Sequence, residues 1–292
     1  MTLERTVRMG AARSLGVRED GDPSGVPVFS LHGTPGSRLL YPPFVADARA
    51  RHLRLLSYDR AGYGDSTPAP GRGIDDAAAE VRTVADALGL ERFGVYGFSG
   101  GGAPALACAA LLPERIVGAA VIAGVAPYPA EGLDWEAGTG EANAEDFALM
   151  RTDRPAWEAK TRQDRLDFLG WNVEQLRAGL SSLCSEADRR ALTDEVAEFI
   201  RAWGVEGLRV SEAGLRDDNL SVILPWGFDL AGVRVPLQLW HGETDRFVPF
   251  AHGRWLSERL PGVDAHLLPG EGHVSTWLRA VPEVHRWLAE RF

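Results

Sequence analysis

Cysteine is scarce in this sequence, and long apolar runs are absent. Two cysteines in 292 residues, Cys108 and Cys184, are too few for a disulfide framework, and Cys108 lies in an apolar stretch typical of a buried thiol. No eighteen apolar residues follow one another, and the charged residues Glu4, Arg5 and Arg8 precede no apolar segment of the kind that a signal peptide needs. We therefore expect a cytoplasmic protein without a membrane span.

Positive charge is also in deficit. The formal net charge of −10 disfavours nucleic acid and anionic membrane surfaces as partners, because both attract a basic protein surface. The glycine-rich stretches lack the Lys-Ser/Thr of a phosphate loop, no Gly-x-Gly-x-x-Gly opens a helix, and no metal-ligand cluster is visible. We expect a small-molecule substrate as the partner, no cofactor, no metal, and a monomer or homodimer.

Short apolar segments alternate with helical segments along most of the chain. Six segments look like buried strands: Val26–Leu31, Leu53–Tyr58, Phe93–Phe98, Val117–Ile122, Leu237–Trp240 and Ala265–Leu268. Between them lie amphipathic helices, of which Asp75–Leu88 is an example. This alternation predicts an α/β fold with a mainly parallel sheet covered on both faces, whose functional loops follow the carboxyl ends of the strands.

The alternation stops between about residues 125 and 226. Three helical segments occur there without an evident strand: Arg162–Gly170, Val173–Leu180 and Glu186–Trp203. We interpret residues 126–226 as a helical insertion in a core domain formed by residues 1–125 and 227–292. The insertion is rich in tryptophan, which would suit an apolar substrate if several of these side chains line the site. These residues are Trp135, Trp157, Trp171, Trp203 and Trp226.

Ser99 is the candidate nucleophile. It lies in the pattern Gly-x-Ser-x-Gly, between an expected strand that ends at Phe98 and an expected helix that begins at Gly100. A strand that turns at once into a helix places the serine in a strained conformation, and a side chain at Gly97 or Gly101 would collide with the neighbouring backbone. The first turn of the helix also directs free N–H groups at negative charge that develops beside the serine.

A serine hydroxyl needs a base and a third group that orients the base. We expect His273 to be the base, because it follows the last expected strand in a flexible loop, and Asp245 to be the acid, because it follows another strand in a polar turn. His241 is expected to be an oriented structural histidine, and Asp134 is a weaker candidate for the acid. Three further histidines look like helix-surface residues: His52, His252 and His285.

The negative oxygen that forms during acyl transfer needs two hydrogen-bond donors. The N–H of Gly100, the residue after the serine, is one candidate, and the N–H of Thr34 is the other. Thr34 belongs to a tight loop that directly follows a strand, and the residues that shape this loop are His32, Gly33, Pro35 and Gly36.

Five features in chain order resemble those of the α/β-hydrolase family: His32–Gly36, Ser57–Ser66, Ser99, Asp245 and His273. The resemblance covers roughly Val26 to Phe292. It implies the α/β-hydrolase fold, a mainly parallel eight-stranded sheet flanked by helices, with the insertion as the helical cap, or lid, of the family. It also implies that Asp59 and Arg60 brace the active-site loops and do not react.

By this resemblance we expect a carboxylesterase-like serine hydrolase that forms an acyl-enzyme at Ser99. Family members that open epoxides or displace halide carry an aspartate at this position, so those activities are not expected. The loop at His32–Gly36 is similar to that of proline iminopeptidase-type enzymes, which usually have glycine where Thr34 stands. In that alternative, acidic residues of the insertion such as Glu131 and Asp146 would hold an ammonium group. Alternatives of another class are a lyase or other cofactor-free enzyme, and a non-catalytic binder.

Overall fold

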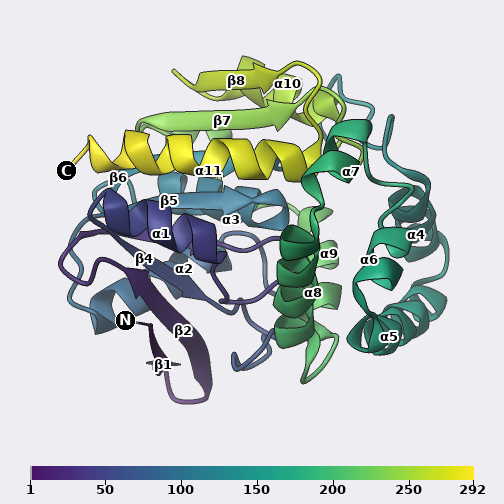
Figure 1. Cartoon of the computed structure of the whole chain (residues 1–292), viewed down its shortest axis with the longest axis horizontal. Coiled ribbons are helices and arrows are strands. Elements are labelled where there is room, and N and C mark those ends of the chain that lie inside the picture. Colours follow the sequence, from purple (N-terminus) through teal and green to yellow (C-terminus); the bar gives the residue numbers. More distant parts are fainter. Residues whose placement is uncertain (1) are drawn as a thin grey trace.

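Eight strands form one sheet in the computed structural model, which describes residues 2–292. The strands are β1 (Leu3–Met9), β2 (Arg13–Gly21), β3 (Val26–Leu31), β4 (Leu53–Tyr58), β5 (Phe93–Phe98), β6 (Ile116–Ile122), β7 (Leu237–Gly242) and β8 (Asp264–Leu268). Their order across the sheet is β1-β2-β4-β3-β5-β6-β7-β8 (Figure 1). Strands β3 to β8 are parallel, and β1 and β2 add an antiparallel edge. The predicted fold, a mainly parallel eight-stranded sheet, is confirmed.

The six strands predicted from apolar segments are all present within two residues of their predicted ends. The hairpin of β1 and β2 was not predicted. Strand β1 lies at the edge of the sheet, where only Val7 of its seven residues is buried, so its sequence shows no apolar alternation.

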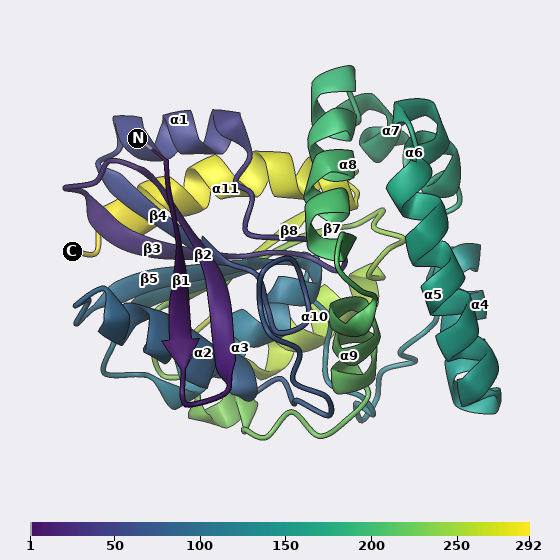
Figure 2. The ribbon, with the colours of Figure 1, turned by 90° about the horizontal axis from the view of Figure 1, so that it is seen from below.

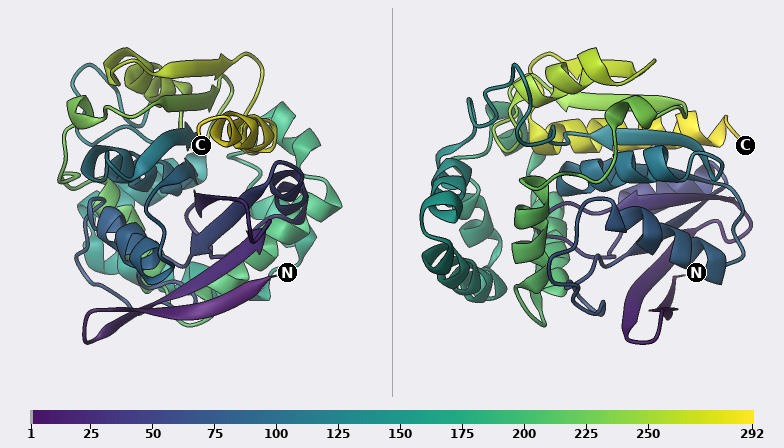
Figure 3. Two further views of the ribbon diagram at one scale, coloured as in Figure 1. Left: turned by 90° about the vertical axis from the view of Figure 1, so that its left-hand side faces the viewer. Right: turned by 180° about the vertical axis from the view of Figure 1, so that it is seen from behind.

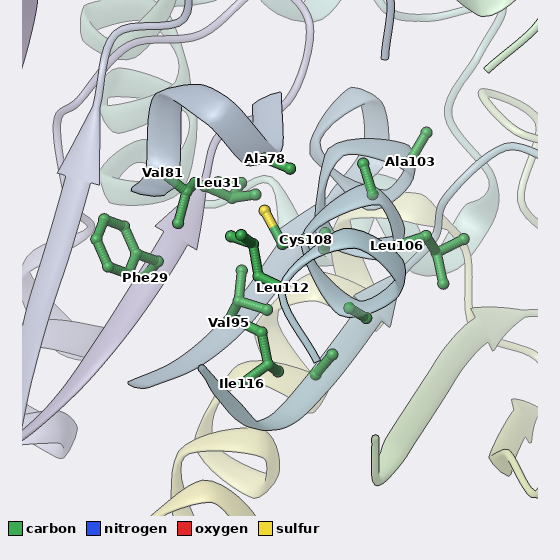
Figure 4. Close-up of a cluster of buried hydrophobic side chains, with 14 of the residues drawn as sticks. Phe29, Leu31, Ala78, Val81, Val95, Ala103, Leu106, Cys108, Leu112 and Ile116 are labelled. Atoms are coloured by element: carbon green, nitrogen blue, oxygen red, sulfur yellow. The ribbon is translucent and has the colours of Figure 1, made fainter. Parts of the chain in front are cut away.

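Helices cover both faces of the sheet (Figures 2 and 3). Helices α1 (Pro42–Ala50) and α11 (His273–Ala289) cover one face, and α2 (Asp76–Ala87), α3 (Gly102–Leu111) and α10 (Phe250–Arg259) cover the other. Figure 4 shows the core beneath α2 and α3, where Cys108 lies among apolar side chains such as Leu31, Ala78 and Leu112. Burial raises the pKa of the Cys108 thiol. The buried thiol predicted at this position is confirmed.

Six α-helices of the described chain lie between β6 and β7 and gather beyond one end of the sheet (Figure 1). They are α4 (Glu141–Thr152), α5 (Arg154–Gly170), α6 (Val173–Gly179), α7 (Glu186–Ala191), α8 (Asp194–Leu208) and α9 (Ala213–Val222). The single helix predicted over Glu186–Trp203 is wrong, because Thr193 caps the start of a separate helix there. The division of the chain at residues 126 and 226 stays a prediction. No helix in residues 2–292 has both the length and the apolar character needed to cross a membrane.

Two histidines predicted to lie on helix surfaces are buried instead, His252 at 1% and His285 at 0% exposure. The Nδ1 of His252 accepts the backbone N–H of Ala126 at 3.1 Å, and its Nε2 donates to the carbonyl oxygen of Trp135 at 2.8 Å. Burial lowers the pKa of His252 to about 4, so the ring is neutral. The prediction failed because a histidine whose two ring nitrogens are both hydrogen-bonded is readily buried.

Candidate active site

Ser99 lies at the junction between β5 and α3, where a short 3-10 turn, Ser99–Gly101, joins the two. Its φ is +53°, a left-handed conformation that costs a non-glycine residue on the order of 1–3 kcal/mol. A Cβ at Gly97 would lie 1.9 Å from the carbonyl oxygen of Gly101, and a Cβ at Gly101 would lie 2.3 Å from that of Leu31. The predicted strand–turn–helix junction is therefore present, and no side chain fits at either glycine.

Asp245 and His273 are joined by a hydrogen bond of 2.7 Å between Oδ2 and Nδ1. Asp245 follows β7 in a turn where its Oδ1 accepts the backbone N–H groups of Phe247 and Val248, both at 2.9 Å. These three contacts hold the buried carboxylate in one orientation. An ionised carboxylate only accepts hydrogen bonds, so Nδ1 of His273 carries the proton and Nε2 is left as the basic nitrogen.

Two aromatic rings enclose the imidazole of His273. The ring of Phe247 stacks on it at a centroid distance of 4.6 Å, and that of Phe98, the residue before Ser99, lies at 4.8 Å. The imidazole of His273 is thus held beside the strand end that carries Ser99. Within residues 2–292 no hydrogen bond joins Ser99 to His273, and such contacts commonly tighten only when substrate binds.

The loop after β3 places Thr34 against the serine turn. A Cβ at Gly100 would lie 3.3 Å from the backbone nitrogen of Thr34. Arg60 donates to the carbonyl oxygens of His32 and of Gly33, the latter at 3.0 Å. The carbonyl of Gly33 and the N–H of Thr34 belong to one planar trans peptide and point in opposite directions. Arg60 therefore directs the N–H of Thr34 away from itself.

Asp218, on α9, binds this arrangement from the insertion. Its carboxylate accepts hydrogen bonds from Arg60 at 2.5 Å, from the hydroxyls of Thr34 at 2.6 Å and Tyr63 at 2.9 Å, and from Arg72. Burial raises the pKa of Asp218, but the two guanidinium groups outweigh burial and hold that pKa well below its usual range. Sequence reasoning missed Asp218, because it belongs to no motif and follows Thr34 by 184 residues.

His32 and Asp59 support the loops around the site through hydrogen bonds and are not positioned to react. The Nε2 of His32 accepts the backbone N–H of Arg60 at 3.1 Å, and burial together with the Arg60 guanidinium lowers the pKa of His32, so its ring is neutral. Asp59 accepts two hydrogen bonds from Arg38, at 2.7 Å from the backbone N–H and 2.6 Å from the side chain. These contacts agree with the bracing role that the resemblance implies for Asp59 and Arg60.

Helix α8 packs directly on the loop that contains Pro35 and Gly36. A Cβ at Gly207 would lie 1.9 Å from the carbonyl oxygen of Gly36, so backbone meets backbone there. The indole N–H of Trp203 donates to the carbonyl oxygen of Ser37 at 2.7 Å. Pro35 lines a cavity that opens over Ser99.

A cavity of about 410 Å³ opens over Ser99, Thr34 and Gly100. Its walls are mainly apolar and come largely from the insertion, with Trp135, Phe147, Phe168, Trp171, Leu183 and Leu215 among the lining residues. Two of the five tryptophans singled out in the sequence therefore line the cavity. The other three, Trp157, Trp203 and Trp226, are buried in packing elsewhere.

His241 lies close to Asp245 but has a hydrogen-bond partner of its own. Its Nε2 is 3.7 Å from Oδ2 of Asp245 and donates to the carbonyl oxygen of Val248 at 2.9 Å. Burial lowers the pKa of His241, so the ring is neutral. This is the oriented structural histidine that the sequence predicted. Asp134, the weaker candidate for the acid, is exposed.

The family model described as the alpha/beta hydrolase fold matches residues 26–280. The chain belongs to this family. Among relatives, the AB hydrolase superfamily protein YisY of Bacillus subtilis (strain 168) is 24% identical over 258 residues, 85% of each chain. A proline iminopeptidase of Neisseria meningitidis is 35% identical over 109 residues, which are 34% of this chain and 33% of the relative.

Solved structures show the same α/β-hydrolase fold. A bromoperoxidase from Bacillus anthracis superimposes with a TM-score of 0.74 at 21% identity, covering 99% of this chain and 100% of that one. A thermophilic esterase from Thermogutta terrifontis superimposes with a TM-score of 0.70 at 21% identity, covering 99% and 98% of the two chains. At this level of identity the likeness establishes the α/β-hydrolase fold, and the activity has to be argued from the site.

Proposed function

We propose that this α/β hydrolase is a serine hydrolase that cleaves an ester or related acyl bond through an acyl-enzyme at Ser99. The observation that carries the proposal is the 2.7 Å hydrogen bond that His273 donates to buried Asp245, beside a serine held at φ +53° on a strand–helix junction. A backbone turn as strained as this one persists only where the surrounding structure enforces it. Such strain is concentrated at functional sites.

In the proposed reaction, Nε2 of His273 takes the proton of Ser99 as its Oγ attacks the acyl carbon. The imidazolium that forms is stabilised by Asp245. The N–H groups of Thr34 and Gly100 bind the oxyanion, each worth about 3–4 kcal/mol in comparable sites. His273 then protonates the departing alcohol, which leaves an ester at Ser99, and a water activated by His273 hydrolyses that ester to release the acid.

The cavity supports a small, mainly apolar substrate. Its volume of about 410 Å³ lies within the range of small-molecule sites, and its walls carry aromatic and aliphatic side chains. Burying such a substrate against Trp135, Phe168 and Trp171 provides binding energy without charged partners.

The aminopeptidase alternative receives less support from the site. An ammonium group needs an unpaired carboxylate in the cavity. Of the four carboxylates that line it, three are paired with cations, and the fourth, Asp167, accepts a hydrogen bond from the side chain of Gln163 at 2.8 Å. Asp146 and Asp164 both bind Lys160, at 3.1 and 2.5 Å, and Asp218 is neutralised by arginines. The limited match to a proline iminopeptidase makes hydrolysis of proline p-nitroanilide the assay that would reinstate this alternative.

Labelling with a fluorophosphonate tests the proposal without a known substrate. We expect stoichiometric labelling that peptide mass spectrometry locates at Ser99, loss of labelling in Ser99→Ala, and slow labelling in His273→Ala. His52→Ala is the matched control, because that imidazole is 84% exposed. An unlabelled protein would refute the proposal and favour the lyase or binder alternatives, and ligand-induced shifts in melting temperature without any turnover would then favour the binder.

A further inference from the structure

The helix that carries the base begins without a capping side chain of its own. His273 is the first residue of α11, and Gly272 occupies the N-cap position. The first turn of a helix leaves backbone N–H groups without partners inside the helix, and a Ser, Thr, Asp or Asn at the N-cap usually accepts from one of them. Since glycine has no side chain, the acceptor at α11 has to come from another element.

Asp188, on α7 of the insertion, is that acceptor. Its Oδ1 accepts the backbone N–H groups of Val274 at 2.8 Å and Ser275 at 3.1 Å. Its Oδ2 accepts the backbone N–H of Ser185 at 3.0 Å and the hydroxyl of Ser185 at 2.9 Å. One fully buried carboxylate thus joins the first turns of α7 and α11, where both helix dipoles favour a negative charge.

Gly272 makes room for this carboxylate. A Cβ at Gly272 would lie 2.1 Å from Oδ2 of Asp188 and 2.2 Å from Oγ of Ser185. The φ of Gly272 is −103°, which any residue adopts, so glycine is required for space and not for backbone conformation. Gly272 therefore has two effects. It provides no capping side chain for α11, and it leaves the space that the carboxylate of Asp188 fills.

We propose that Asp188 is a positioning residue for His273, an inference that rests on the proposed function. Asp245 fixes Nδ1 of the imidazole, and Asp188 fixes the backbone of the two residues that follow His273. Without Asp188 the first turn of α11 loses both acceptors, and the imidazole shifts relative to Ser99 while it keeps its bond to Asp245. A shift of about 1 Å in a reacting group costs on the order of a hundredfold in rate.

The test compares Asp188→Ala and Asp188→Asn with Glu186→Gln, a change on the same helix at a side chain that is 71% exposed. The substrates are an ethyl ester and a p-nitrophenyl ester of one short acid, and kcat/KM reports acylation for each. We expect Asp188→Ala to lower kcat/KM roughly a hundredfold on the ethyl ester, Glu186→Gln to change nothing, and Asp188→Asn to fall between, because an amide oxygen still accepts from Val274 and Ser275.

The leaving group separates positioning from general structural damage. Ethoxide needs a proton from His273, whereas p-nitrophenolate leaves without one, so a misplaced imidazole lowers kcat/KM on the ethyl ester about tenfold more. Loss of folded protein lowers both equally, and equal losses would overturn the inference, as would Asp188→Ala matching the Glu186→Gln control on the ethyl ester. A wild-type protein that cleaves neither ester and resists labelling at Ser99 would instead refute the proposed function, and the inference with it.

Discussion

Replacing Asp218 by asparagine should destabilise the protein more than the replacement of any single exposed charged residue would. Asp218 is the counter-charge of two buried guanidinium groups, Arg60 at 1% and Arg72 at 6% side-chain exposure. An asparagine keeps the shape but presents one acceptor oxygen and one donor NH₂ group to a site whose neighbours all donate. Two buried arginines would then lose the carboxylate that pairs with both of them.

Removal of one partner from a buried ion pair costs about 3–5 kcal/mol, and we expect Asp218→Asn to lower the free energy of unfolding by that amount. Urea denaturation followed by tryptophan fluorescence measures it. Asp217→Asn is the comparison, because Asp217 is also buried but pairs with Arg216, whose side chain is 30% exposed, and we expect a smaller loss there than for Asp218→Asn. A loss below about 1 kcal/mol for Asp218→Asn would refute the reasoning. In the folded fraction, kcat should also fall, because Arg60 no longer holds the peptide that carries the N–H of Thr34.

Three further predictions concern the acid, the serine turn and a buried histidine. Asp245→Asn should lower kcat by about four orders of magnitude through the wrong tautomer of its imidazole partner, while Glu243→Gln should not, as steady-state assays will show. Gly97→Ala should lower the free energy of unfolding by about 3 kcal/mol or more, whereas Gly170→Ala, at a helical position with open space around it, should not lower the urea midpoint. The pKa of His252 is about 4 in the folded state against 6.5 in the unfolded state. The free energy of unfolding should therefore decline by up to about 3 kcal/mol as the pH falls from 6.5 to 4. Urea unfolding across this range should show a shallower decline in His252→Gln.

The sheet and the serine turn were predictable because their signals are local. The buried parallel strand β5 reads as a nearly continuous apolar segment, since both faces of the sheet are covered. The serine turn needs glycine at fixed offsets, because backbone atoms stand within 2.3 Å of the missing side chains. The residues predicted after the strand ends lie at the same edge of the sheet because parallel strands all end there.

The contacts that the sequence did not predict are those between the insertion and the core. Asp188 and Asp218 are acidic residues on short helices, where most aspartates are solvated, and nothing in the neighbouring sequence distinguishes them. Their partners lie in the core, 86 and 184 residues away, at Val274 and Thr34. Which carboxylate is buried depends on how the insertion packs on the core, and that packing has no signature in a single sequence.

These two carboxylates meet one physical requirement. The loop that carries Thr34 and the helix that begins at His273 both lie beyond the ends of the strands, where the sheet itself no longer holds the backbone. A buried carboxylate there is costly unless several donors surround it, and Asp188 and Asp218 each accept at least four hydrogen bonds. Because every one of those donors has a defined direction, satisfying the carboxylate also fixes the backbone that carries the donors. The insertion therefore contributes more than a wall of the cavity, since its polar residues hold two elements that the sheet alone leaves unsupported.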